Sequence, residues 1–241
     1  MPISSGLPQG FNAHAYDAIV VGASFAGSVC ARRLAEALGY RVAVLEERPH
    51  VAGNAGDYLD LQGQSRADCL LRARTPRVSG FFARFADQLD PTEDDPQDFP
   101  SSACASIFAA MLDHDLIDVI CDVDARGLIS FDETHVLIGG ELYGGEVVYT
   151  GPLDVLFDCD LGRLSYPAPG HVPEAAPGAA DADRATIDPA SGDLYERYLE
   201  RIEEVTNFHL AGRVAEYRTY DMDAAVEAAL ELSDELIACH S

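Results

Sequence analysis

The feature that most constrains this chain is a glycine-containing turn that joins a short apolar run to a helix. Tyr16–Val21 is rich in β-branched residues, and Gly22–Gly27 follows it directly. Ser28–Leu38 has apolar residues at near-helical spacing, and Gly39 stands where a helix commonly ends. A second buried strand is expected at Arg41–Glu46. Together these segments predict a βαβ unit with parallel strands, and therefore an α/β fold.

The turn has the pattern of a dinucleotide-binding fingerprint. Gly22 would allow the tight turn, and Gly27 would let the helix pack close to the sheet. The free N–H groups at the helix N-terminus suit a pyrophosphate. Glu46, at the end of the second strand, is the expected acceptor for the ribose hydroxyls of an adenosine, whereas Ser24 departs from the pattern because it replaces the middle glycine.

The rest of the chain has weaker patterns. Residues 1–14 are interpreted as an N-terminal tail and residues 15–241 as one domain, in which 62–100 and 167–193 are loop-rich. Further elements are expected in chain order: a short helix at Phe81–Leu89, a helix at Ser102–Leu112, a strand at Asp115–Val123, a β-rich stretch at Gly127–Tyr149, a helix at Asp193–Val205, a strand at Asn207–Ala211 and a helix at Asp221–Cys239.

Composition narrows the range of partners. The 16 cations, all of them arginine, face 41 acids, and the formal net charge of −25 disfavours nucleic acid and anionic membrane surfaces. No apolar run is long enough to span a bilayer, and the first residues lack a secretion signal, so we expect a cytoplasmic protein. The six cysteines are scattered without metal-ligand spacing, and no metal site is predicted.

Several blocks of the sequence resemble the UDP-galactopyranose mutase family. The first is Tyr16–Cys30 with Val44–Asn54, and the second is Val148–Asp154, followed by Phe157-Asp158 and Gly162–Tyr166. The closing blocks are Asp193–Tyr198 and Asn207–Met222. These blocks occur in the family's order and cover a little under half of the chain.

The resemblance implies a Rossmann-like FAD-binding domain with a parallel sheet and with reduced β-rich and helical insertions. In the family, the flavin must be reduced, and it carries the sugar through the ring contraction of UDP-galactopyranose to the furanose without net redox change. The partners implied are FAD and a nucleotide sugar. The resemblance assigns these residues to the cofactor site: Gly22, Ser24, Phe25, Ala26, Gly27, Glu46, Glu47, Arg48, Gly53, Asn54, Tyr149, Thr150, Gly151, Gly212, Arg213, Asp221 and Met222.

The chain also departs from the family pattern in ways that concern the substrate. It is much shorter than the family's usual members, contains no tryptophan, and has no histidine between Asp60 and Ala73. Thr219 stands where the family has a tyrosine that contacts the diphosphate. The sequence therefore assigns no catalytic residue.

Alternatives remain open at this point. The chain could be a non-catalytic dinucleotide-binding remnant that serves as a binding or assembly module, and homo-oligomerisation is compatible with the sequence. A nicotinamide-dependent oxidoreductase would rest on the fingerprint alone, and the absence of lysine rules out a Tyr-x-x-x-Lys pair. Single residues also have structural interpretations: Asp221 as a helix cap, Arg213 as a surface cation and Tyr149 as a core residue.

Overall fold

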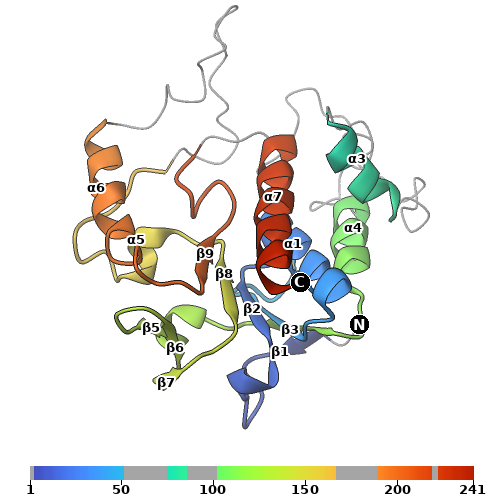
Figure 1. Cartoon of the computed structure of the whole chain (residues 1–241), viewed down its shortest axis with the longest axis horizontal. Helices are drawn as coiled ribbons and strands as arrows, with labels where there is room; N and C mark the ends of the chain where they lie inside the picture. The colour runs from blue at the N-terminus through green and yellow to red at the C-terminus, as the bar shows by residue number, and fades with distance from the viewer. Residues whose placement is uncertain (1–2, 52–74, 86–101, 167–188, 219–221) are drawn as a thin grey trace, which may run out of the picture.

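A parallel β-sheet forms the centre of the molecule in a computed structural model of the chain (Figure 1). The structure describes residues 3–51, 75–85, 102–166, 189–218 and 222–241. Six strands pair in the order β1-β4-β3-β2-β8-β9, and every pairing is parallel. A second, antiparallel sheet has the order β5-β6-β7. The predicted α/β fold with a parallel sheet is confirmed.

The elements follow the chain in a regular alternation at first and become more β-rich in the middle. Their bounds are β1 Ile3–Ser5, η1 Ala13–Ala15, β2 Ala18–Val21, α1 Phe25–Leu38, β3 Val42–Leu45, α3 Pro76–Ala83, α4 Ser102–Leu112, β4 Ile117–Cys121, η4 Ala125–Leu128, β5 Ile129–Phe131, β6 Val136–Ile138, β7 Glu141–Leu142, β8 Glu146–Tyr149, α5 Leu153–Leu156, α6 Pro189–Leu199, β9 Phe208–Leu210 and α7 Met222–His240.

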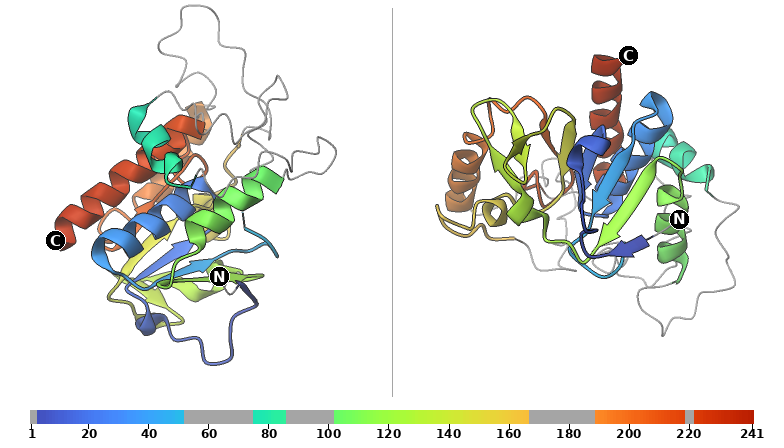
Figure 2. Two further views of the ribbon diagram at one scale, coloured as in Figure 1. Left: turned by 90° about the vertical axis from the view of Figure 1, so that its right-hand side faces the viewer. Right: turned by 90° about the horizontal axis from the view of Figure 1, so that it is seen from below.

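The two faces of the main sheet bury different layers (Figures 1 and 2). Successive strand residues point to opposite faces, so Val42 and Val44 join the core beneath α1, α3, α4 and α7, whereas Ala43 and Leu45 join the core on the other face. That second core is closed by the antiparallel strands with α5 and α6. Because both faces are covered, all four residues of β3 are buried.

Helix α1 and its neighbours support the carboxyl end of β2. The side chain of Ser24 caps α1, and Gly39 ends it in the left-handed conformation at φ 67°. Helix α7 packs along α1, and Phe25 at the start of α1 meets the rings of Phe82 and Phe108 from α3 and α4. The predicted βαβ unit is therefore present, with the helix beginning three residues earlier than expected.

Three expectations for the poorly patterned regions differ from the structure. Ile3–Ser5 pairs with β4 as an edge strand, so the segment expected to be a tail contributes to the sheet. Pro76, interpreted as part of a loop, is the first residue of α3, where a helix needs no N–H donor, and Thr75 caps the helix. Helix α6 begins at Pro189, inside the stretch expected to be a loop.

Among the cysteines whose side chains the structure describes, Cys30 and Cys121 are buried, Cys159 is half-buried and Cys239 is exposed, and all four are free thiols. Within the described residues, no group of three or more histidine, cysteine, aspartate or glutamate side chains is arranged to hold a metal ion. No helix among them is long and apolar enough to cross a membrane.

Candidate functional site

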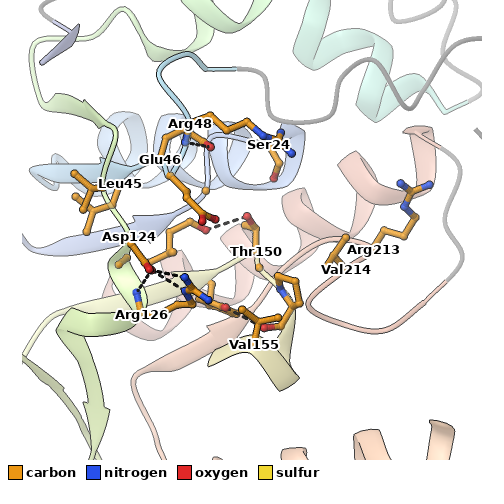
Figure 3. Close-up of a pocket in the computed structure, with 18 of the residues that line it drawn as sticks. Ser24, Leu45, Glu46, Arg48, Asp124, Arg126, Thr150, Val155, Arg213 and Val214 are labelled. Atoms are coloured by element: carbon orange, nitrogen blue, oxygen red, sulfur yellow. Dashed lines mark hydrogen bonds and ion pairs between the residues drawn. The ribbon is translucent and has the colours of Figure 1, made fainter. Parts of the chain in front are cut away.

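A pocket of about 320 Å³ opens at the carboxyl ends of the central parallel strands (Figure 3). The chain passes from β2 to β3 on one side and later returns to β8 on the other, so the pocket lies where the strand order reverses. Open α/β sheets bind ligands at such points. The lining residues are Val21, Gly22, Ser24, Phe25, Leu45, Glu46, Glu47, Arg48, Val123, Asp124, Ala125, Arg126, Tyr149, Thr150, Gly151, Pro152, Val155, Arg213 and Val214.

The two glycines of the fingerprint are required by close approaches between backbone segments. Gly22 has φ +98°, and a Cβ atom there would lie 2.1 Å from the Oγ1 atom of Thr150. A Cβ atom on Gly27 would lie 2.1 Å from the carbonyl oxygen of Gly22 and 3.1 Å from a methyl group of Val20. The turn and the first turn of α1 can therefore touch only because both residues lack side chains.

Ser24, at the position of the middle glycine of the fingerprint, is the N-cap residue of α1. Its backbone is extended at φ −75°, a value that does not require glycine, and its hydroxyl accepts a hydrogen bond from the N–H of Gly27 at 3.4 Å. Ala26, one of the buried residues that follow, lies against the turn at Gly212, where a Cβ atom would come within 3.0 Å of the Ala26 Cβ. The departure from the fingerprint therefore leaves the strand-turn-helix geometry intact.

Glu46 connects the end of β3 to the glycine turn. Its carboxylate is buried and accepts hydrogen bonds from the N–H of Ala23 at 2.7 Å and from the N–H of Arg48 at 3.0 Å. Glu47 is exposed at the rim of the pocket, and Figure 3 shows the side chain of Arg48 extending toward Ser24. The Glu46 carboxylate is thus fixed next to the glycine turn that leads into α1.

The segment after β8 closes the other side of the turn. The N–H of Thr150 donates to the carbonyl of Val21 at 3.0 Å, and its hydroxyl donates to the same carbonyl at 2.9 Å. Tyr149 is buried and donates its hydroxyl to the carbonyl of Pro152 at 3.0 Å; burial raises the pKa of this tyrosine well above its usual value. A side chain on Gly151 would collide with the Tyr149 ring. Tyr149 is mainly a core residue that also lines the pocket.

Arg213 approaches the pocket from the segment after β9. The preceding Gly212 has φ +87° and donates its N–H to the carboxylate of Glu216 at 2.9 Å. In Figure 3, Arg213 points away from Glu46 and Thr150, so it forms the far border of the pocket.

Some residues assigned from the sequence cannot be placed in this site. Gly53, Asn54 and Asp221 lie outside the described residues, as does Thr219. Met222 is the first residue of α7, and only its backbone is described.

Sequence reasoning missed the part of the pocket that follows β4. Val123, Asp124 and Ala125 line it, together with Arg126 from η4. Asp124 caps η4 by accepting from the N–H of Arg126 at 3.1 Å, and it also holds the Arg126 guanidinium through two hydrogen bonds. The available signal was the Asp-x-Arg pattern that begins at Asp124, shortly after a buried strand.

Comparison with known proteins agrees with this geometry. The sequence profile of the NAD(P)-binding Rossmann-like domain family matches residues 20–89, and that of the UDP-galactopyranose mutase family matches residues 86–170. A UDP-galactopyranose mutase from Mycoplasma pneumoniae is 24% identical over an alignment of 193 residues, and the match covers 58% of this chain and 48% of that protein. The resemblance to UDP-galactopyranose mutases is confirmed. It is divergent and partial, because the chain spans about half the length of this curated mutase.

A solved structure supports the fold independently. The Thermovibrio ammonificans THI4 structure aligns with a TM-score of 0.50 at 14% identity and covers 93% of this chain and 89% of its own. At that identity the likeness concerns the fold alone. The chain thus has a Rossmann-like fold, and part of its sequence is similar to the mutases.

Proposed function

We propose that the chain is a flavoprotein that binds FAD in the pocket at the carboxyl ends of β2, β3 and β8. The observation that carries this proposal is the convergence of the glycine turn, the buried Glu46 carboxylate and Thr150 on one pocket. In this assignment the pyrophosphate lies at the N-terminus of α1, facing the backbone N–H groups of the first helical turn, and Glu46 accepts from the adenosine ribose. These residues fit the group because the glycines let the turn and α1 approach closely, and because Gly22, Ser24 and Phe25 at the start of α1 line the pocket.

The carboxylate also constrains which dinucleotide can bind. Glu46 is 6% exposed and is held by two backbone N–H groups, so it cannot swing away from a ligand. A 2′-phosphate on the ribose would meet this negative charge with little water to screen it. We therefore expect FAD or NAD to bind and NADP to be rejected. The match to the mutase family over residues 86–170 supports FAD as the ligand.

We further propose that the substrate is a nucleotide sugar and that the reaction is the non-redox interconversion of a pyranose and a furanose. The support is the similarity to a curated mutase and to the mutase family profile. When bound and reduced, FAD would supply a nucleophile toward the sugar's anomeric carbon. The pocket's own contribution, in the described residues, is to bind and orient the adenosine and pyrophosphate portions, and Arg213 places a cation at its far border.

The cofactor is tested by the absorption spectrum of the purified protein and by thermal shift with added FAD. We expect flavin absorption, or a concentration-dependent rise in melting temperature after reconstitution. Gly22→Ala should abolish binding because its methyl group would displace Thr150. Gly140→Ala is the matched control: Gly140 has φ +85°, close to that of Gly22, but a Cβ atom added there would have no atom within 4 Å. A colourless protein that shows no shift with FAD refutes the proposal.

The reaction is tested separately with the FAD-loaded protein. Dithionite-reduced holoprotein should convert UDP-galactofuranose to UDP-galactopyranose, and the oxidised holoprotein should not. Chromatographic separation of the two nucleotide sugars measures the conversion. Binding of FAD without conversion of this substrate would refute the mutase assignment and favour a binding or assembly module.

A further inference from the structure

We propose that the adenine ring of the bound dinucleotide stacks on the guanidinium group of Arg126, whose orientation is fixed by hydrogen bonds to Asp124. This inference rests on the proposed FAD binding and adds to it a residue for base recognition. The fingerprint accounts for the pyrophosphate and the ribose, but none of its residues recognises the base. Arg126 lines the same pocket from an element that the fingerprint does not include.

The order of strands places the base next to Arg126. The pyrophosphate position is set by the turn after β2, and the ribose position by Glu46 at the end of β3. Strand β4 pairs with β3 on the side away from β2, and η4 follows β4 closely. Along the sheet from β2 to β4, the pyrophosphate comes first, the ribose second and the base third. The base therefore reaches the carboxyl end of β4, where Val123, Asp124 and Arg126 line the pocket.

The guanidinium of Arg126 is fixed in orientation. Its Nε donates to one carboxylate oxygen of Asp124 at 2.7 Å, and its Nη2 donates to the other at 2.5 Å. The same carboxylate accepts from the Arg126 backbone N–H at 3.1 Å. This pairing raises the pKa of the arginine and lowers that of Asp124. Hydrogen bonds at two edge nitrogens restrict rotation of the guanidinium, and they leave its flat faces available for stacking.

Charge favours a base over a phosphate as the group beside Arg126. The Asp124 carboxylate already neutralises the guanidinium, and the negative charge of Glu47 acts on it as well. A pyrophosphate would meet both carboxylates, whereas adenine is neutral and flat. Arginine planes stack on nucleobases, and the apolar side chains of Leu45 and Val123 line the same pocket.

The experiment compares ligand binding by titration calorimetry in three variants. Arg126→Leu should weaken FAD and ADP binding roughly 3- to 30-fold, the range expected for a cation–π contact. Arg126→Lys should lose most of this affinity too, because an ammonium group lacks the flat fork. Binding of inorganic pyrophosphate should be unchanged in both. Arg41→Leu is the control: Arg41 pairs with Asp118 at 3.1 Å and lies over the Tyr16 ring, and it does not line this pocket.

The outcomes separate this inference from the proposal on which it rests. If wild-type protein binds FAD and Arg126→Leu binds ADP equally well, the stacking assignment is wrong and the FAD proposal stands. If Arg126→Leu weakens pyrophosphate as much as ADP, or Arg126→Lys retains full affinity, Arg126 acts through its charge and the inference is overturned. If wild-type protein binds neither FAD nor ADP, both proposals are refuted. Unchanged circular dichroism of each variant excludes misfolding as the cause, and Arg126 is only partly buried.

Discussion

Replacing Gly27 by alanine tests whether the contact between α1 and the glycine turn is as tight as the structure indicates. The added methyl group would lie 2.1 Å from the Gly22 carbonyl oxygen, which is backbone and cannot rotate aside. Overpacking in a dense interior typically costs about 1–3 kcal/mol, and a clash with rigid backbone belongs at the upper end. Alanine regains about 1 kcal/mol in helix propensity. The net destabilisation expected is about 2 kcal/mol.

Thermal denaturation followed by circular dichroism measures this loss. For a chain of this size, about 2 kcal/mol corresponds to a melting temperature lower by about 4–8 °C. Gly80→Ala is the matched control, because Gly80 is also a helical glycine, lies in α3, and has no atom within 4 Å of the added methyl group. That variant should melt about 1–4 °C higher than wild type. If Gly27→Ala is as stable as wild type, the close approach of α1 to the turn is wrong.

Two buried carboxylates away from the pocket give further predictions. Burial alone would raise the pKa of Glu146, but hydrogen bonds and charge from His209 and His240 lower it. The ionised carboxylate therefore stabilises the folded state above pH 4.5, and this contribution to the free energy of unfolding is lost as the pH falls through the depressed pKa. Urea unfolding at a series of pH values should show a shallower acid loss in Glu146→Gln than in wild type. Asp154 is 2% exposed and accepts from the hydroxyl of Tyr166 at 2.9 Å, so Asp154→Ala should lower the free energy of unfolding by about 3 kcal/mol, measured by urea titration.

Exposed carboxylates provide the controls for both substitutions. Glu141→Gln should leave the acid dependence unchanged, because Glu141 is exposed. Asp193→Ala, at an exposed position of α6, should change the stability by less than about 0.5 kcal/mol, a typical effect at a surface position. An acid profile of Glu146→Gln that coincides with wild type would show that the two histidines do not depress the pKa of this carboxylate.

The part of the fold that could be predicted from sequence is the part specified by local pattern. Tyr16–Glu46 contains its own strand, turn, helix and strand signals, and the structure places β2, α1 and β3 there. Gly22 and Gly27 were identified because a fixed spacing reflects a fixed backbone geometry. Glu46 followed from its position at the end of a strand.

The parts that could not be predicted depend on distant partners. Ile3–Ser5 has only three residues of strand, and it is held by pairing with residues more than a hundred positions later in β4. Arg126 is brought into the same pocket as the glycine turn by the parallel pairing of β3 with β4. No periodicity within a short window reports such a juxtaposition. Pro76 falls in the stretch 62–100 that the sequence predicts to be loop-rich, because a proline alone does not show whether it starts a helix or interrupts one.

The hydrogen bond from the N–H of Ala23 to Glu46 has a consequence for how ligand fragments combine. One oxygen of this carboxylate fixes the glycine turn, and the other is held by the N–H of Arg48, so the same side chain sets the spacing between the two halves of the site. A molecule that joins ribose and diphosphate meets a spacing already fixed, whereas separate fragments gain nothing from it. ADP-ribose and ADP should therefore bind more tightly than the summed binding free energies of adenosine and pyrophosphate imply.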